Sequence, residues 1–318
     1  MKILVIDDFH ADLVKGLEQQ GCVVNYQPNS TRNEIMNLPN EYEGIIVRSK
    51  IKIDQNLLQH FSILKFVARG GAGMDGIDTA YCKDKDIELV NAPEGNRDAV
   101  AEHTLAFILA FQTNLIEANN AVFSGIWDRE RYRGTELKEK TVGIIGYGNT
   151  GREVSKRLNA FGCKIIANDL MPDKISDSWV NSVSFEELLK ESDIITLHVP
   201  FTNLTHHMVN SHFISQIKSS SLLLNMSRGE ILDTFDVLKL LSKNKFAGLC
   251  IDVIEGENAI GFPVISSEIK SLMQQLKHKL LITPHVGGWT TESYQKIAAV
   301  LLNKIVKLKN GGGYVGHE

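Results

Sequence analysis

Three glycines at fixed spacing mark the segment of the chain best suited to hold a nucleotide. Gly146, Gly148 and Gly151 follow a short apolar run and precede a stretch with apolar residues at helical spacing. Glycine permits a tight turn and lets the backbone approach a pyrophosphate, and the N-terminus of the following helix offers free N–H groups with partial positive charge. An acid, Asp169, ends the next apolar run, 18 residues after Gly151. The segment is therefore predicted to bind a dinucleotide.

Asp169 also predicts which dinucleotide is preferred. A carboxylate at this position binds the ribose hydroxyls and repels a 2′-phosphate, so we expect NAD rather than NADP. Asn149 and Thr150, which lie between the second and third glycines, belong to the same predicted cofactor site. The glycine spacing alone would also fit a structural turn, or another nucleotide-type ligand such as S-adenosylmethionine.

A second set of polar residues stands at or just beyond the ends of three apolar runs. Arg228, Asp252 and His285 each follow or end a segment with the composition of a buried strand. Ligands bind at the carboxyl ends of the strands in an open parallel sheet. Histidine exchanges protons near neutral pH, and arginine holds a carboxylate through a fork of donors. These residues are therefore candidates for catalysing a reaction of a substrate that carries a carboxylate.

The elements that must position these residues alternate between strand-like and helix-like segments along the whole chain. Such alternation predicts an α/β protein with two Rossmann-like, doubly wound parallel-sheet domains. The expected strands are Ile3–Ile6, Val23–Tyr26, Ile45–Val47, Leu64–Ala68, Ile87–Val90, Val142–Ile145, Cys163–Ala167, Asp193–Leu197, Leu222–Asn225, Leu249–Val253 and Leu280–Ile282.

The first half carries no GxGxxG at its first turn, where Asp7 and Asp8 stand instead, so it is predicted to be the substrate domain. We expect that domain to be discontinuous, with residues 1–97 joined by a returning C-terminal helix in 290–318, and the NAD-binding domain to span 98–289.

Composition narrows the class of protein further. A length of 318 residues predicts about two domains, and 23% charged residues with a net charge of −4 give no general attraction to nucleic acid or membrane. No run of 18 apolar residues occurs, and MKILVIDD at the N-terminus is typical of a first strand rather than a signal peptide. The four scattered cysteines lack metal-ligand spacing, so we expect free thiols, a reducing cytoplasm and no metal site.

The middle of the chain has two contrasting segments. Residues 99–110 are almost uncharged and predict a helix that is buried in the core or against a partner subunit. The arm of residues 125–134 is polar and contains Arg129. That arm is either a solvated loop or an anion-binding arm.

Taken together, these segments resemble the D-2-hydroxyacid dehydrogenase family along almost the whole chain. The matching segments are VRSKIKI (47–53), RGGAGMDGID (69–78), NAPEGNRDAVAEHTLAFILA (91–110), GIIGYGNTG (143–151), HVPFTNLTHHMVN (198–210), NMSRGEILD (225–233), IDVIEGE (251–257) and TPHVGG (283–288). The resemblance implies two Rossmann-like domains with a cleft between them, and a homodimer built on the NAD-binding domain.

The resemblance also implies roles for individual residues. The catalytic arginine, glutamate and histidine of the family fall on Arg228, Glu257 and His285. Further contacts to the cofactor fall on His198, Val199, Pro200, Asp252 and Gly287. Contacts to the substrate fall on Arg48, Ser49, Arg69, Gly71, Gly73 and Arg129.

The chemistry of the three catalytic candidates agrees with oxidation of a 2-hydroxy acid. Such a reaction needs a base for the hydroxyl proton, a hydride acceptor and a cation that holds the carboxylate. His285 suits the first role and Arg228 the third, while Glu257 would fix the tautomer of the imidazole.

Within the family the chain resembles the phosphoglycerate dehydrogenases most, which implies oxidation of 3-phosphoglycerate to 3-phosphohydroxypyruvate in serine biosynthesis. Several arginines suit a phosphorylated substrate. Two alternatives stay open: a dehydrogenase of another 2-hydroxy acid (lactate, glycerate or glyoxylate type), and an NAD-sensing binding protein resembling the family's co-repressors. Trp289, which follows the PHVGG segment, either narrows the substrate pocket or packs at the start of a helix. The chain ends soon after its last predicted helix, so we expect no regulatory C-terminal domain.

Overall fold

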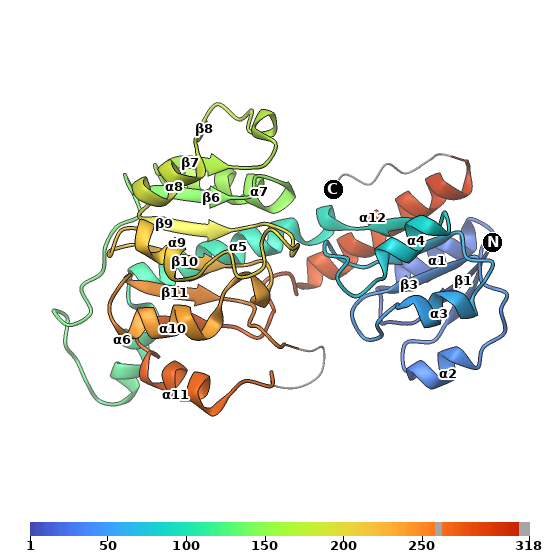
Figure 1. Ribbon diagram of the computed structural model, residues 1–318, viewed down its shortest axis with the longest axis horizontal. Helices are drawn as coiled ribbons and strands as arrows, with labels where there is room; N and C mark the ends of the chain where they lie inside the picture. Colours follow the sequence, from blue (N-terminus) through green and yellow to red (C-terminus); the bar gives the residue numbers. More distant parts are fainter. Residues whose placement is uncertain (258–262, 312–318) are drawn as a thin grey trace. The chain divides into compact units, whose positions relative to one another are not determined.

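A computed structural model of the protein describes residues 1–257 and 263–311 (Figure 1). The chain forms two compact units. One comprises Met1–Asn96 together with the described chain from Trp289 onward, and the other comprises Arg97–Gly288. Both are built on an all-parallel sheet, which confirms the predicted α/β class.

The first unit contains a five-stranded parallel sheet in the order β2-β1-β3-β4-β5. Its strands are β1 (Lys2–Val5), β2 (Val23–Tyr26), β3 (Gly44–Val47), β4 (Phe66–Arg69) and β5 (Glu88–Asn91). Its helices are α1 (Ala11–Gln19), α2 (Arg32–Met36), α3 (Gln55–His60), α4 (Thr79–Asp84) and α12 (Thr291–Lys309).

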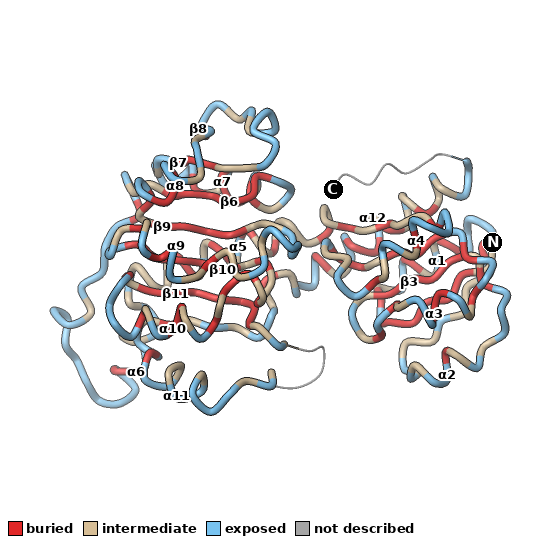
Figure 2. Tube along the Cα trace, in the orientation of Figure 1, coloured by how far each residue is buried: buried red, intermediate tan, exposed pale blue. Residues whose placement is uncertain are grey.

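Alternating residues of the first strand show how both faces of this sheet are covered. Ile3 and Val5 pack in one apolar cluster with Leu13 of α1 and Leu301 of α12. Leu4, the residue between them, belongs to a second cluster with residues of α2, α3 and α4. The inner strands of a parallel sheet covered on both sides have apolar residues at nearly every position. Figure 2 shows β3, in the middle of this sheet, as a buried strand.

The second unit contains a seven-stranded parallel sheet in the order β12-β11-β10-β9-β6-β7-β8. Its strands are β6 (Thr141–Ile145), β7 (Lys164–Asn168), β8 (Val180–Ser182), β9 (Ile194–Leu197), β10 (Leu222–Asn225), β11 (Gly248–Ile251) and β12 (Leu280–Ile282). Its α-helices are α5 (Pro93–Gln112), of which the first residues belong to the other unit, α6 (Leu115–Phe123), α7 (Asn149–Asn159), α8 (Phe185–Glu191), α9 (Ser211–Gln216), α10 (Thr234–Ser242) and α11 (Ser267–Gln275). Two short 3₁₀ helices, η1 (Pro172–Lys174) and η2 (Gly229–Ile231), complete the unit.

The same alternation covers this sheet on both faces. Val142 and Ile144 of β6 lie in a cluster with residues of α5 and α7, such as Phe107 and Val154. Ile145 lies in the opposite cluster, where α8, α9 and α10 pack. The register pairs Ile145 with Leu197 of β9 and with Asn168 of β7, so the glycine turn follows a strand in the interior of the sheet.

Three elements of the second unit were absent from the sequence-based expectation. They are α6, β8 and α11. β8 is an edge strand of three residues in which only Val180 is buried, and α11 buries no residue completely, so neither has the apolar content of a core element. The apolar residues at helical spacing after the glycine turn include Phe161, which lies beyond the end of α7 and is 40% exposed.

The helix expected over residues 99–110 extends over Pro93–Gln112 and is followed after a short break by α6. Among the described residues no single helix is long and apolar enough to cross a membrane. The helices α5 and α6 pass that test only as a pair, with a bend of 61° between them.

Candidate functional site

The glycine turn is closed against the protein at two positions and open at one. A Cβ on Gly146, whose φ is +90°, would lie 2.4 Å from the carbonyl oxygen of His198, and one on Gly151 would lie 2.2 Å from the carbonyl oxygen of Gly146. A Cβ on Gly148 would meet no atom of the described chain within 4 Å. The first and third glycines therefore permit close packing, whereas the second leaves the backbone bare on its outer side.

The helix that follows the turn presents free backbone donors. α7 begins at Asn149 and Thr150, and its N-cap Gly148 has no side chain to accept a hydrogen bond from the first turn. The N–H groups of a helix N-terminus that lack a capping side chain are suited to an anion such as a pyrophosphate. The turn is therefore suited to an anion, and its binding of dinucleotide phosphates stays a prediction.

Asp169 lies beside this turn and is oriented by it. Its Oδ2 accepts a hydrogen bond from the backbone N–H of Tyr147 at 2.7 Å, and its Oδ1 accepts one from the N–H of Met171 at 2.9 Å. The carboxylate is therefore held at the end of β7 next to the glycine turn, where a ribose attached to the phosphates would place its hydroxyls.

The segment His198–Pro200 contributes backbone rather than the imidazole to this region. The carbonyl oxygen of His198 packs against Gly146, while the N–H of Val199 donates to Oγ of Ser227 at 3.1 Å. Nε2 of His198 pairs with Oγ1 of Thr196 at 2.9 Å. Burial lowers the pKa of His198 to about 3, so its ring is neutral at ordinary pH and is a structural group.

Two of the predicted catalytic residues are brought into direct contact. Nδ1 of His285 lies 2.7 Å from Oε1 of Glu257, although 28 residues separate them along the chain. The His285 side chain is 49% exposed and that of Glu257 is 22% exposed. The Glu257 carboxylate therefore contacts Nδ1 of the imidazole. The other ring nitrogen, Nε2, is the one that could exchange a proton with a substrate.

Asp252 holds the loop that carries His285. Its carboxylate, which is almost completely buried, accepts hydrogen bonds from the N–H of Val286 at 2.9 Å, the N–H of Gly287 at 2.7 Å and the hydroxyl of Thr283 at 2.5 Å. The backbone N–H of His285 donates to the Asp252 carbonyl at 2.8 Å. His285 has a φ of +54°, which is uncommon for a residue other than glycine, so these bonds fix an unusual backbone conformation.

His103 supports the same loop and was not identified from the sequence. Its Nε2 lies 3.0 Å from Oγ1 of Thr283, and its ring packs edge-on against Phe107 on α5. The residue falls within the segment 91–110 that carries the resemblance. Its position on an apolar helix gave no sign of the strand end that it contacts.

Arg228 follows β10, the strand next to β11, whose end carries Asp252. The turn is braced because Nδ2 of Asn225 donates to the Arg228 carbonyl at 2.7 Å. Nη1 of Arg228 donates to the carbonyl of Ser227 at 2.6 Å. The guanidinium is therefore anchored at one nitrogen on the strand-end side of the sheet that carries His285.

In the first unit Arg48 lies among aromatic rings. Its guanidinium carbon is 4.3 Å from the centroid of the Trp289 ring, 5.5 Å from that of Tyr294 and 5.9 Å from that of Phe9. The backbone N–H of Arg48 donates to Oδ2 of Asp7 at 2.5 Å. Burial lowers the pKa of Arg48 from its usual value, and the negative charge of Asp7 partly opposes this shift. Trp289 thus contacts Arg48 and directly precedes the capping residue of α12, while remaining 67% exposed.

The other predicted substrate contacts of this unit lie at two neighbouring strand ends. Ser49 follows β3, and Gly71 and Gly73 follow β4. Nε of Arg69 donates to the Arg48 carbonyl at 3.2 Å, and a Cβ on Gly71 would lie 2.4 Å from the Arg69 guanidinium. The side chain of Arg69 therefore bonds the end of β4 to the backbone of the loop after β3.

Arg129 is exposed and lies in the loop after α6, in the second unit. Its expected convergence with Arg48 and Arg69 on one substrate stays a prediction.

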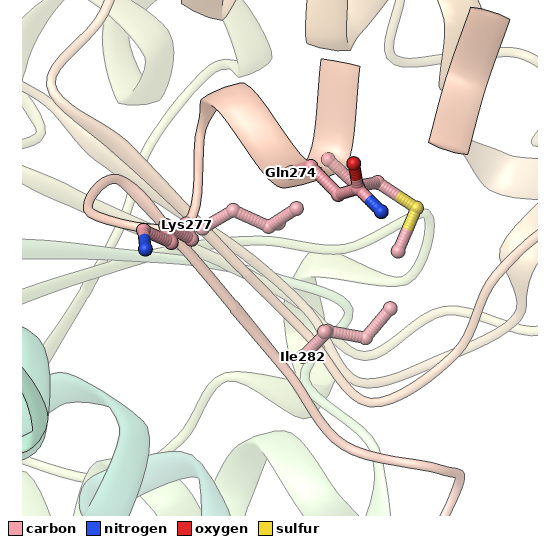
Figure 3. Close-up of a pocket in the computed structure, with 5 residues that line it drawn as sticks. Gln274, Lys277 and Ile282 are labelled. Atoms are coloured by element: carbon pink, nitrogen blue, oxygen red, sulfur yellow. The ribbon is translucent and has the colours of Figure 1, made fainter. Parts of the chain in front are cut away.

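A separate hollow lies at the edge of the second sheet. Figure 3 shows it between α11 and the edge strand β12, lined by Met273, Gln274, Lys277, Leu280 and Ile282. None of these is a predicted site residue, and the lining is largely apolar with no acid or histidine. The hollow is not a candidate for the chemistry described above.

Comparison with known proteins gives a consistent picture. The family model described as "D-isomer specific 2-hydroxyacid dehydrogenase, NAD binding domain" matches residues 105–287. A D-3-phosphoglycerate dehydrogenase of Methanocaldococcus jannaschii is 33% identical over 98% of this chain. The chain spans 58% of the length of that relative.

Two further similarities involve proteins of comparable length. A hydroxypyruvate reductase of Thermotoga maritima is 34% identical over 87% of this chain and 88% of its own. The crystal structure of a D-lactate dehydrogenase from Aquifex aeolicus, complexed with NAD and lactic acid, is 28% identical with a TM-score of 0.81, and the match covers 98% of this chain and 96% of the other.

Proposed function

We propose that this chain, which belongs to the D-isomer specific 2-hydroxyacid dehydrogenase family, transfers a hydride between a D-2-hydroxy acid and NAD. The observation that carries the proposal is the 2.7 Å contact between Nδ1 of His285 and Oε1 of Glu257. The contact lies in the same unit as the glycine turn and Asp169, which fit the cofactor.

In this mechanism His285 moves the proton of the reacting hydroxyl. Glu257 accepts a hydrogen bond from Nδ1–H, which leaves Nε2 without a proton and able to take one from the hydroxyl of a 2-hydroxy acid. Oxidation leaves the imidazole protonated, and the adjacent carboxylate stabilises that charge. In the reverse reaction the imidazolium returns the proton to the carbonyl oxygen. Bound NAD supplies the hydride acceptor.

Arg228 is proposed to bind the carboxylate of the substrate and polarise the neighbouring oxygen. A guanidinium offers several N–H donors in a planar fork, which matches a carboxylate and an adjacent oxygen. One nitrogen of Arg228 is occupied by the Ser227 carbonyl, which fixes the side chain. Asp252 is proposed to act indirectly, since its carboxylate orients the loop of His285.

The substrate we propose is 3-phosphoglycerate, which is oxidised to 3-phosphohydroxypyruvate in serine biosynthesis. Support comes from the phosphoglycerate dehydrogenase relatives and from Arg48, Arg69 and Arg129, whose charges suit a phosphate.

A second candidate is an unphosphorylated 2-hydroxy acid, such as that of a hydroxypyruvate or glyoxylate reductase. It is favoured by the Thermotoga maritima relative, which is close to this chain in length.

The test is a set of steady-state assays in both directions. NADH consumption is measured with 3-phosphohydroxypyruvate, hydroxypyruvate, glyoxylate and pyruvate, and NADH formation with 3-phosphoglycerate and D-glycerate. We expect the highest kcat/KM with 3-phosphohydroxypyruvate in one direction and with 3-phosphoglycerate in the other. A preference for hydroxypyruvate or glyoxylate would move the assignment to the second candidate, and turnover of none would contradict the enzymatic proposal.

We also propose a homodimer through the NAD-binding unit, in a reducing cytoplasm. Helix α6 and the arm after it expose large apolar side chains, including Phe123 at 87% and Trp127 at 83%, and such surfaces are typical of interfaces. All four cysteines are free. Light scattering after size-exclusion chromatography should give a molar mass twice that of the chain. The Phe123→Asp variant should have the mass of a single chain. A wild type with the mass of a single chain would contradict the dimer.

A further inference from the structure

Two adjacent histidines and a glutamate form a cluster away from the predicted catalytic residues. Nε2 of His207 lies 3.0 Å from Oε1 of Glu255, and the rings of His206 and His207 are stacked with centroids 4.0 Å apart. One possible ligand atom from each of the three residues lies within 4.8 Å of the other two. We propose that His206, His207 and Glu255 bind a divalent transition-metal ion of the zinc class.

The local backbone explains why neighbouring histidines lie on the same side. Successive side chains of an extended segment point in opposite directions. Here the chain turns over residues 203–207, and His207 has a φ of +49°, which is uncommon for a residue other than glycine. The N–H of His207 donates to the Glu230 carbonyl at 2.9 Å, and Nδ2 of Asn210 donates to the His207 carbonyl at 2.8 Å. The turn is therefore fixed before any ion binds.

The backbone of Glu255 lies against the segment that the histidine turn contacts. A Cβ on Gly229 would lie 2.2 Å from the N atom of Glu255, so these two chain segments pass in direct contact. The third donor is thus carried by a segment that packs directly against η2, to whose Glu230 the histidine turn is bonded.

Two imidazole nitrogens and one carboxylate oxygen are a donor set that suits zinc, with a fourth position left for water. Zinc lies about 2.0–2.2 Å from such atoms, so the ligand atoms around one ion are at most about 4.4 Å apart. The separations here are within 4.8 Å, and the closest pair is already at 3.0 Å. Small side-chain movements would complete the site.

One of those movements is a rotation of His206. Its ring is inclined by only 16° to that of His207, and the lone pair of each nitrogen lies in the plane of its own ring. Two nearly parallel rings cannot both direct a nitrogen at one ion, so the His206 ring must turn out of the stack. His206 is exposed and its other ring contact is an edge-on one with Phe201 at 5.8 Å, so this rotation is open to it.

An ion at this site would join the turn of residues 203–207 to the segment after β11. That segment carries Glu257 two residues beyond Glu255 and contacts Gly229, the neighbour of Arg228. Metal binding should therefore stiffen the chain next to the predicted catalytic residues. The cysteine spacing that predicted no metal site carries no information about adjacent histidines.

The test uses the full chain, treated with a chelator and dialysed. Calorimetric titration with ZnCl₂ should show one ion per chain, and cobalt(II) should give the visible absorption of a tetrahedral site with nitrogen ligands. His206→Gln and Glu255→Gln should each weaken zinc binding by roughly 100-fold or more, since loss of even an outer partner costs about 10–100-fold. Zinc should raise the Tm of the wild type and leave that of His206→Gln unchanged.

Two control variants make the result specific. His212→Gln removes an exposed imidazole nearby on α9 and should bind zinc as the wild type does. His285→Gln removes a histidine that contacts a different glutamate, Glu257, and this variant should also bind zinc as the wild type does. Zinc binding that disappears in His285→Gln but persists in His206→Gln would overturn the proposal, as would a wild type that binds no zinc. His206 is exposed, so we expect the metal-free His206→Gln variant to have the Tm of the metal-free wild type. Equal Tm values show that the variant is folded and that its loss of zinc binding is local.

Discussion

The guanidinium of Arg48 lies 4.3 Å from the centroid of the Trp289 ring, at the point where the chain enters α12. The two residues are far apart in sequence but belong to the same compact unit. An arginine over the face of a tryptophan is attracted by the negative face of the ring. Trp289 therefore fixes the side chain that is predicted to contact the substrate.

Replacing Trp289 tests this relationship. Trp289→Ala should lower the free energy of unfolding by about 0.5–1 kcal/mol, the usual magnitude of a cation–π contact at an exposed site. If Arg48 contacts the substrate, the same variant should raise KM more than it lowers kcat, and Trp289→Phe should recover part of both effects. Urea unfolding and steady-state kinetics provide the measurements. Equal effects of the Ala and Phe variants would show that the ring face is unimportant.

Much of the fold could be predicted because its strands are buried on both faces. The continuous apolar runs of β6, β9 and β10 mark them in the sequence, and the glycine spacing identifies the turn after β6. The edge strand β8 and the exposed helix α11 bury little, so the sequence carried no comparable signal for them.

The site was predictable only in part, for a related reason. The contact of His285 with Glu257 follows from the resemblance, but the left-handed backbone of His285 and the loop held by Asp252 depend on hydrogen bonds between distant segments. The contact of Trp289 with Arg48 is of the same kind. Periodicity and spacing report local structure and do not report such pairs.

The open side of Gly148 allows a direct test of the cofactor site. Gly148→Ala adds a methyl group that would meet no described atom of the chain within 4 Å, and the φ of −86° is acceptable for alanine. We expect stability close to that of the wild type and a rise of at least about tenfold in the Kd for NAD, because the methyl group occupies the space of the pyrophosphate.

Gly76→Ala is the matched control, since Gly76 is equally open but lies in the other unit. Calorimetry with NAD and thermal unfolding of both variants measure the two effects. An unchanged affinity of Gly148→Ala for NAD would show that the phosphates bind elsewhere.

Cofactor preference should depend on Asp169. Both of its oxygens are already oriented by backbone N–H groups, so the carboxylate is ready to accept hydrogen bonds from ribose hydroxyls. A hydrogen bond to a charged group contributes about 1.5–3 kcal/mol, so Asp169→Ala should lower kcat/KM for NAD by about 10–100-fold. The same variant should use NADP better than the wild type does, because the repulsion of a 2′-phosphate is removed. A wild type that prefers NADP would refute this role of Asp169.

Glu257 should support proton transfer by His285. Glu257→Gln keeps the size of the side chain but removes the negative charge 2.7 Å from Nδ1 of His285. An amide can present its NH₂ group to Nδ1, which favours the tautomer with the proton on Nε2, so the ring can no longer accept the substrate proton there. We expect kcat for oxidation to fall while the Kd for NAD is unchanged, as measured by steady-state kinetics and fluorescence titration. A kcat equal to that of the wild type would detach Glu257 from the mechanism.

The most direct test of the proposed reaction is NADH formation by the wild type and by His285→Ala, with 3-phosphoglycerate and with D-glycerate as substrates. Binding of NAD is measured in parallel by fluorescence titration. A positioned proton acceptor typically contributes about 10²–10⁴-fold to the rate. We expect a loss of that size in kcat for His285→Ala, with the Kd for NAD unchanged within about twofold. A variant that retains kcat within about tenfold of the wild type, or a wild type that binds NAD and oxidises neither acid, would contradict the proposed role of His285.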